Sequence, residues 1–296
     1  MTANEVAWLE AEEAPPQRER LWRRLMASRS GRAGLILTLV TLGLALLAVL
    51  GATPYDPISQ RPVDRLQGPS AAYWFGTDQF GRDILSRTMA GVASSLQVAI
   101  VAVFISAVLG TTFGVMSGFF GNRVRGPVNA LTNILFAFPP LLLALALASV
   151  ATRNWFTVAV AISIVYIPIF VRVTRAPVLS LREVDFIQAA RVLGFSSSRI
   201  LFRHLLPNIM SIVIVQVTLS MSWAVLTAAA LSYLGLGTPP PTPALGGMVF
   251  EAKNLAATAW WTMAAPGLVL IVFVVGLNLL GDGLRDALDP RHENRS

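Results

Sequence analysis

Residues 88–122 read TMAGVASSLQVAIVAVFISAVLGTTFGVMSGFFGN and contain no Asp, Glu, Lys or Arg. A helix of about 20 apolar residues spans the hydrocarbon core of a bilayer, so this tract is long enough to cross one. Five further tracts also lack these charged residues, namely 33–52, 126–152, 154–171, 205–250 and 254–281. The pattern predicts an all-α polytopic membrane protein and excludes a soluble enzyme, a disordered chain and an outer-membrane barrel, whose strands are short and alternating.

The overall composition agrees with a membrane protein that performs no chemistry itself. Charged residues make up 13% of the 296, about half of what a typical soluble domain carries. The absence of Cys excludes disulfides and Cys-ligated zinc, and two isolated His are too few for a metal site. Lys253 is the only lysine, and no phosphate-binding G-x-x-x-x-G-K-[ST] loop surrounds it. We therefore expect no catalytic residue and no cofactor in this chain.

The charge-free tracts predict six transmembrane helices. The first is 33–52, and it follows a tail, 1–32, whose segment 18–32 is basic and amphipathic. The remaining spans belong to a core at 92–290, before a short tail at 291–296. These spans are expected at about 92–117, 128–150, 155–171, 208–232 and 263–280. The main connecting loops are then 53–91, 172–207 and 233–262, of which the last carries a Pro-rich stretch expected to be a loop or re-entrant turn.

The distribution of basic residues predicts how the chain is oriented. Segments 18–32, 118–127 and 172–207 carry six, two and six Arg, fourteen in all, whereas the alternating segments 53–90, 151–155 and 233–262 carry only six basic residues together. Cytoplasmic loops are enriched in Lys and Arg. We therefore expect both termini and loop 172–207 in the cytoplasm, and read the net charge of +7 as a topology signal rather than as a nucleic-acid site.

Three features within the spans bear on mechanism. No charged residue lies at mid-membrane depth, which disfavours a proton-driven carrier but leaves open a sodium carrier built from backbone carbonyls. Gly110, Gly114 and Gly118 recur every four residues, which is typical of close helix packing in lipid. Pro139–Pro140 and Pro168 are expected to kink their helices.

Loop 172–207 is far longer than a hairpin between two spans requires. Ser180 to Glu183 matches a capping box, which predicts a helix starting near Leu181, and Gly194 stands where its C-terminal cap is expected. Ser196–Ser198 predict the N-cap of a second short helix, and Pro207 either ends this helix or opens the next span. The pair reads either as a docking element, with Gln188–Ala189–Ala190 as a small surface for a partner, or as two helices lying on anionic lipid. Spacing alone does not separate the two.

The same loop resembles a known motif. Its pattern Gln188–Ala189–Ala190–x3–Gly194–x9–His204–x–Leu206–Pro207 is similar to the E-A-A-x3-G-x9-I-x-L-P loop of ABC importer permeases. In that family the loop forms a coupling helix that fits a cleft on the cytoplasmic ATPase subunit. The resemblance assigns coupling to Gln188, Ala189, Ala190, Gly194, His204 and Pro207. Gln188 replaces the family's Glu, and His204 replaces Ile, as is common in peptide-type permeases.

Three other segments resemble the C-type subunit of dipeptide, oligopeptide and nickel permeases. These are WFGTDQFGRDILSR at 74–87, LSYLGLG at 231–237 and NLLGDGLRDALDP at 278–290. The resemblance implies the type I ABC importer permease fold. It also implies contacts with the binding protein or the pathway near Trp74, Phe75, Gly76, Thr77, Asp78, Gly235 and Gly237. Gly76–Thr77–Asp78 is equally compatible with a turn capped by the Asp.

The resemblance further implies partners, location and substrate class. The family works in the bacterial inner membrane as a heterodimer of two permease subunits, with two ATPase subunits that hold ATP and magnesium and an extracytoplasmic solute-binding protein. Its substrates include di- and oligopeptides, the best supported here, and also nickel chelates, glutathione and other small solutes. Two hypotheses from other classes stay open at this stage: a secondary transporter or channel that works alone, and a membrane scaffold that transports nothing.

Overall fold

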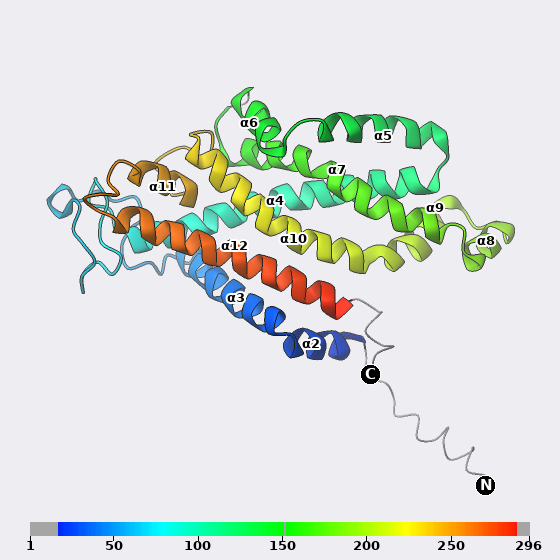
Figure 1. Ribbon diagram of the computed structural model, residues 1–296, viewed down its shortest axis with the longest axis horizontal. Helices are drawn as coiled ribbons and strands as arrows, with labels where there is room; N and C mark the ends of the chain where they lie inside the picture. Colours follow the sequence, from blue (N-terminus) through cyan, green and yellow to red (C-terminus); the bar gives the residue numbers. More distant parts are fainter. Residues whose placement is uncertain (1–16, 151, 289–296) are drawn as a thin grey trace, which may run out of the picture.

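The computed structural model describes residues 17–150 and 152–288, and within them every regular element is a helix apart from one isolated bridge between Thr77 and Asp83 (Figure 1). Residues 1–16 of the predicted N-terminal tail at 1–32 lie outside the described residues, and so does the predicted tail at 291–296. Five helices exceed 20 residues and run along the long axis of the molecule. The elements are α2 Gln17–Ala27, α3 Arg29–Val49, α4 Ile84–Phe119, α5 Asn122–Phe136, α6 Pro140–Val150, α7 Trp155–Leu181, α8 Asp185–Val192, α9 Ser197–Ile200, α10 Leu206–Tyr233, α11 Leu245–Ala252 and α12 Trp261–Leu288, with a 3₁₀ turn at Pro62–Asp64 and a π turn at Leu201–Leu205.

The helices run between two unlike ends. One end carries the long segment between α3 and α4 together with α11 (Figure 1, left). The opposite end carries the start of α5, then α8 and α9, and α2 with the last turns of α12 also lie toward it. The three segments that the basic count predicted to share one side of the membrane therefore lie toward the same end, away from α11.

The glycine face predicted in the second span is confirmed as a packing surface. A Cβ added at Gly110 would lie 2.5 Å from Cβ of Phe170, and one added at Gly118 would lie 2.8 Å from Cγ1 of Val178, both on α7. A Cβ added at Gly114, between them, would lie 2.7 Å from the backbone oxygen of Val171. Three small residues on one face therefore let α4 and α7 approach more closely than any side chain would allow.

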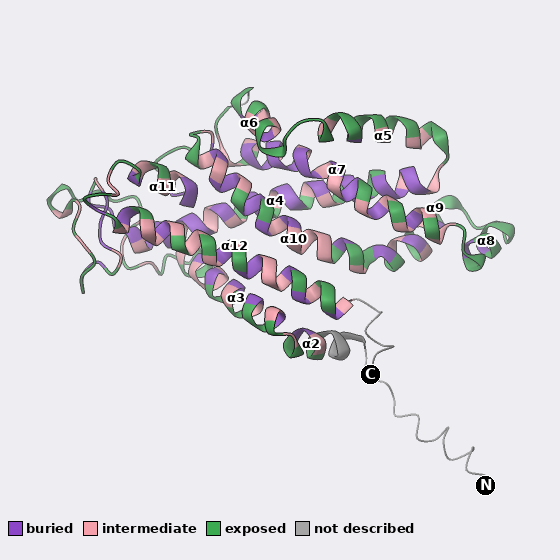
Figure 2. Cartoon of the chain, viewed as in Figure 1, coloured by how far each residue is buried: buried purple, intermediate pink, exposed green. Residues whose placement is uncertain are grey.

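The core lies where α4, α7, α10 and α12 meet. Phe170 of α7 and Phe273 of α12 are fully buried there, among valines and alanines of α4 and α10. The outward faces of α3 and α12 expose apolar side chains such as Ile36, Leu39 and Ile271 (Figure 2). Exposed apolar bands of this length suit a hydrocarbon environment rather than water.

The stretch 128–150 differs from its prediction as one span. It is split into α5 and α6, which are bent by 93° at a break between Phe136 and Pro140. Pro139 and Pro140 cause the break because neither has an amide hydrogen to continue the helix, and each restricts the residue before it. The described residues thus contain five helices long and apolar enough to span a membrane, or six if the bent pair counts as one.

Two boundaries of loop 172–207 also differ. The predicted capping box at Ser180 is wrong: α7 continues through Leu181, and the backbone oxygen of Ser180 accepts from the amide of Glu183 as part of its last turn. The next helix, α8, begins four residues later at Asp185. The second short helix passes through the π turn into α10, which begins at Leu206 rather than at 208. Pro207 stands in the first turn of α10, so the alternative in which it opens the next span is confirmed.

The outer loops contain more structure than expected. The α4 helix begins at Ile84, eight residues before the predicted 92, because Asp83 caps it by accepting from the amide of Ser86 at 2.8 Å. The predicted loop 233–262 includes the short helix α11, which follows the Pro-rich stretch. In the N-terminal part α2 ends at Ala27, and the hydroxyl of Ser28 caps α3 through the amide of Gly31.

Candidate functional site

The α8–α9 element protrudes from one end of the bundle (Figure 1). The turn between the two helices is built around Gly194, whose φ is +77°. The amide of Phe195 donates to the oxygen of Ala190 at 3.0 Å and that of Gly194 to Arg191 at 3.0 Å, which is the Schellman pattern. The predicted glycine C-cap is therefore confirmed. The predicted N-cap is confirmed too, because Ser196 Oγ accepts from the amide of Arg199 at 3.4 Å.

The buried face of α8 holds the element to the bundle. Ile187 is fully buried and Ala190 is 5% exposed, and both belong to a cluster with Ile200, Leu205 and residues of α4, α7 and α10. The expectation that Ala190 contributes to a small docking surface is therefore wrong. Its methyl group packs inward because Ala190 stands three residues after the fully buried Ile187 and so lies on the same face of α8.

The outward face of α8 is apolar at its C-terminal end. Gln188 and Ala189 are exposed, and Gln188 Nε2 donates to the oxygen of Glu183 at 3.0 Å. Val192 is 88% exposed and Leu193 is 73% exposed. Ala189, Val192 and Leu193 stand three and four residues apart and so share one face, which we call the tip face. Two large apolar side chains fully exposed at a protruding tip indicate a surface that a partner covers.

His204 and Pro207 do not contribute to the tip face. The His204 ring lies 6.3 Å from those of Phe186 and Phe195, measured between centroids, and stacks on Phe195 at 19°. It thus connects both ends of α8 to the start of α10, as a positioning residue. Pro207 is exposed in the first turn of α10.

At the opposite end of the bundle most of the predicted contact residues are internal. Thr77 and Asp78 are buried, and Gly76 has φ +73° with its α-carbon so close to Trp261 that a Cβ would lie 2.7 Å from the indole ring. Trp261 Nε1 donates to the Thr77 oxygen at 3.2 Å. This segment therefore packs the outer loop against α12. Phe75 is half-buried, and Trp74, at 71% exposure, is its outward-facing side chain.

The predicted Gly235 and Gly237 close the end of α10. Gly235 has φ +81°, and its amide donates to the oxygen of Ser232 while Leu236 donates to Leu231 at 2.8 Å. Gly237 is buried against Ser232 with no room for a Cβ. Both glycines thus shape the turn that leads into the Pro-rich stretch, and only Gly235 is exposed.

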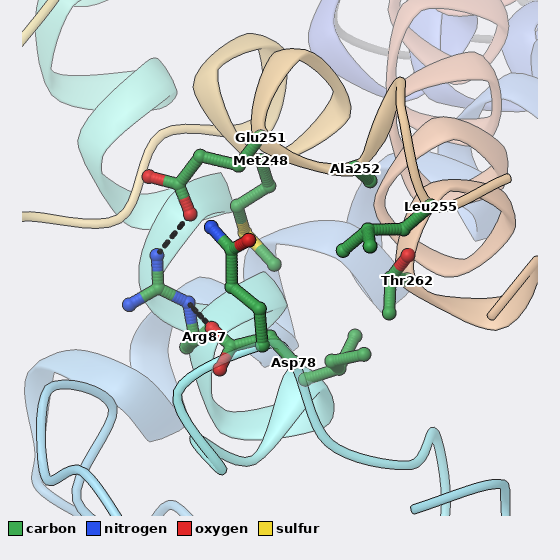
Figure 3. Close-up of a pocket in the computed structure, with 9 residues that line it drawn as sticks. Asp78, Arg87, Met248, Glu251, Ala252, Leu255 and Thr262 are labelled. Carbon is green, nitrogen blue, oxygen red and sulfur yellow. Dashed lines mark ion pairs between the residues drawn. The ribbon is translucent and has the colours of Figure 1, made fainter. Parts of the chain in front are cut away.

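A buried ion network joins α4 to α11 (Figure 3). Arg82 Nε lies 2.6 Å from the Asp78 carboxylate and Nη2 lies 2.9 Å from that of Glu251. Arg87 lies 3.5 Å from each of the same two carboxylates. Met248, Leu255 and Thr262 help to enclose a cavity of about 20 Å³ beside it, which is room for one water molecule.

No role was assigned from the sequence to either arginine of this network, and none to Glu251. Arg82 and Arg87 stand in the 74–87 segment that carries the resemblance. The sequence alone does not show that these two residues are only 4% and 2% exposed, or that their guanidinium groups face carboxylates. Glu251 is the first acidic residue after a charge-free tract of 46 residues, 205–250, and that isolation is the one signal that could have drawn attention to it.

A second polar cluster organises the outer loop. Tyr73 donates its hydroxyl hydrogen to the Asp64 carboxylate at 2.8 Å and accepts from Arg61 at 3.4 Å. The hydrogen bond to Asp64 raises the pKa of Tyr73, and desolvation acts in the same direction. The hydrogen bond to Tyr73 raises the pKa of Arg61 in turn. These contacts are structural, and no group of three His, Asp or Glu side chains that could hold a metal ion occurs in the described ranges.

Comparison with known proteins places this architecture. Residues 110–294 match the family model described as "Binding-protein-dependent transport system inner membrane component". The dipeptide transport system permease protein DppC of Alkalihalophilus pseudofirmus is 41% identical over 276 residues, covering 93% of this chain and 90% of that protein. The di/tripeptide permease DppC of Pseudomonas aeruginosa is 40% identical, covering 95% and 94%. The glutathione transport system permease protein GsiD of Pectobacterium atrosepticum is 38% identical, covering 93% and 91%.

Solved structures agree on the fold. A methionine ABC transporter, MetNI, in inward-facing conformations aligns with a TM-score of 0.57 at 19% identity, covering 69% of this chain and 96% of that one. The relatives are transport permease subunits rather than enzymes, and the family implies an ATPase and a binding protein as partners. With its type I permease fold and its several membrane-spanning helices, the chain belongs to the family of binding-protein-dependent transport system inner membrane components and is an inner-membrane permease subunit of an ABC importer.

Proposed function

We propose that this permease imports di- and oligopeptides and is driven by separate ATPase subunits that bind the tip face of α8. The observation that carries the substrate class is the identity of 41% and 40% to relatives named for dipeptide and di/tripeptide transport, over nine-tenths of the chain. The relative named for glutathione fits the same class, because glutathione is itself a small peptide. A nickel chelate or another small solute stays the alternative.

The tip face supports the coupling role. It offers Val192 and Leu193 to a cleft on a partner, while Ile187 and Ala190 anchor the same helix in the bundle. A force applied at the tip is thereby transmitted to α4, α7 and α10, which all contribute to the anchoring cluster. Ala189 belongs to the tip face and Gln188 borders it. Gly194, His204 and Pro207 support the tip face by fixing the turn and the start of α10.

The proposed assembly has two different permease subunits, two ATPase subunits and an extracytoplasmic binding protein. Both termini and the tip face are cytoplasmic, and Trp74 and the outer loop face the binding protein or the pathway. ATP and magnesium are bound by the ATPase subunits alone, since no phosphate-binding loop occurs in this sequence. ATP-driven closure of the ATPase pair pulls on α8 and rocks the bundle between inward- and outward-open states.

Uptake of a labelled dipeptide into vesicles tests the proposal. Membranes that contain both permeases, the binding protein and the ATPase subunits are compared with membranes that lack only the ATPase subunits. The proposal expects uptake that depends on ATP and on the ATPase subunits. Uptake that persists without them would favour a carrier or channel that works alone, and ATP-dependent uptake of a nickel chelate but not of dipeptides would replace the substrate class.

A further inference from the structure

A polar groove separates α5 from α7 near the end of the bundle that carries α8. It has a volume of about 390 Å³ and is lined on the α5 side by Asn129, Thr132 and Asn133. On the α7 side it is lined by Arg172 and Arg175, with small and apolar residues around them. Asn129, Thr132 and Asn133 stand at helical spacing on one face of α5, and so do the two arginines on α7. The groove is therefore polar on both walls.

The two arginines have no acidic counterpart. Among the described residues no carboxylate forms an ion pair with Arg172 or Arg175. The nearest acid along the chain on this side, Glu183, pairs with Arg182 at 2.8 Å instead. Two guanidinium groups thus share one groove without a negative charge to balance them, an arrangement that a bound anion stabilises.

The guanidinium groups are held in place by other means. Arg172 Cζ lies 4.3 Å from the centre of the Phe136 ring, and Arg175 Nη1 donates a hydrogen bond to Asn129 Oδ1. Arg175 Nε is buried and has no hydrogen-bond partner among the described residues. A ligand in the groove does not reach this buried atom, so the accessible donors come from Arg172, which is exposed.

We propose that this groove binds an oxyanion, either the carboxylate of a solute or the phosphate of a lipid. Arginine presents donors in a planar fork that matches the two oxygens of either group. Arg172 is the eighteenth residue of α7, so it lies about 26 Å along a helix that starts at Trp155, close to the thickness of the bilayer core. Both a lipid headgroup and a solute leaving the pathway can be reached at that depth.

Thermal unfolding of the purified full-length chain in an uncharged detergent tests the site without any transport. One arm adds phosphatidylglycerol and, as its neutral match, phosphatidylcholine. The other arm adds dialanine and, as its match without a carboxylate, dialaninamide. A ligand that binds only the folded state raises Tm, and the member of at least one pair that carries the oxyanion is expected to raise it by roughly 2–4 °C more than its match.

Variants locate the binding. The double substitution Arg172→Gln and Arg175→Gln is expected to abolish the difference within the responding pair, whereas Arg285→Gln, at an exposed arginine near the end of α12, keeps it. If the double variant does not fold, Arg172→Lys with Arg175→Lys retains both charges but not the planar fork, and is expected to bind at least severalfold more weakly.

The outcomes separate the two sources. A shift with phosphatidylglycerol alone identifies a lipid site, and a shift with dialanine alone identifies a solute site that deepens the proposed function. The proposal is overturned if neither oxyanion ligand raises the Tm of the native protein more than its match does. It is also overturned if the double glutamine variant shows the same Tm difference as the native protein. Either result leaves the proposed peptide import untouched, because that function is tested by uptake.

Discussion

Arg82 lies 2.9 Å, from Nη2 to the carboxylate oxygen, from Glu251, and the two residues are 169 positions apart in the chain. The contact ties the segment before α4 to the short helix α11 on the far side of the Pro-rich stretch. Arg87 of α4 pairs with the same Glu251 (Figure 3). Arg82 is 4% exposed and Arg87 is 2% exposed, so each needs a nearby negative charge to be tolerated. The network therefore holds the outer end of the bundle together.

Removing the charge of Glu251 is expected to destabilise this end. Glu251→Gln leaves two buried guanidinium groups to share Asp78, and because the Glu251 side chain is 31% exposed we expect a loss of about 1–2 kcal/mol rather than the larger cost of a fully buried pair. The readout is unfolding of the purified protein in detergent. Glu183→Gln removes an exposed partner of Arg182 and is expected to cost less than about 0.5 kcal/mol. Equal losses in the two variants would contradict a structural role for the network.

The packing of α4 on α7 predicts a contrast between glycines. Gly114→Ala places a methyl group 2.7 Å from the oxygen of Val171, so we expect a loss of several kcal/mol or failure to accumulate. Gly43→Ala in α3 meets nothing within 4 Å and is expected to be neutral or stabilising by up to about 1 kcal/mol. Protein level and thermal unfolding check both, and a well-folded Gly114→Ala protein would show that the helices are less tightly packed.

The two faces of α8 predict different failures. Ala190→Asp buries a charge among Ile187, Ile200 and Leu205, so it is expected to lower the amount of folded protein, not only coupling. If Ala190 were instead part of an outward docking surface, this variant would accumulate normally. Membrane-fraction immunoblots decide between them, and a normal level of Ala190→Asp would place this residue on the outside after all.

Orientation is tested by cysteine labelling, which the absence of native Cys makes simple. Single cysteines at the exposed positions Ser59 and Ser197 are treated in intact cells with a membrane-impermeant maleimide. We expect Ser59→Cys to label readily and Ser197→Cys to label only after the membrane is opened, since the basic segments lie with Ser197. The reverse pattern would invert the topology.

How much of the fold and of the candidate site could be predicted from the sequence depended on how far apart in the chain the interacting residues stand. The turn at Gly194 and the cap at Ser196 were predictable because their hydrogen bonds join residues within five positions of each other. The inward face of Ala190 was not, because the cluster that buries it includes residues far away in the chain, such as Val115 of α4. Pro139–Pro140 predicted a break, but its angle of 93° follows from the packing of α6 against α7.

The buried network illustrates the same limit at longer range. Arg82, Arg87 and Asp78 all stand in one recognisable segment, yet their partner Glu251 lies beyond four predicted spans and a Pro-rich stretch. Nothing local to Glu251 indicates which cation it meets. The groove between α5 and α7 was missed for a similar reason, because Arg172 and Arg175 were counted as topology signals before the polar face of α5 was known to oppose them.

The most direct test of the account concerns the tip face. Val192→Asp puts a charge on a residue that is 88% exposed, so folding and membrane level are expected to be unchanged. The matched control is Val63→Asp, a residue 94% exposed in the outer loop at the opposite end. Co-purification of the ATPase subunits and dipeptide uptake are measured in the same cells. The account predicts that Val192→Asp loses both by at least tenfold while Val63→Asp keeps both. Normal ATPase binding and uptake by Val192→Asp at a normal protein level would contradict it.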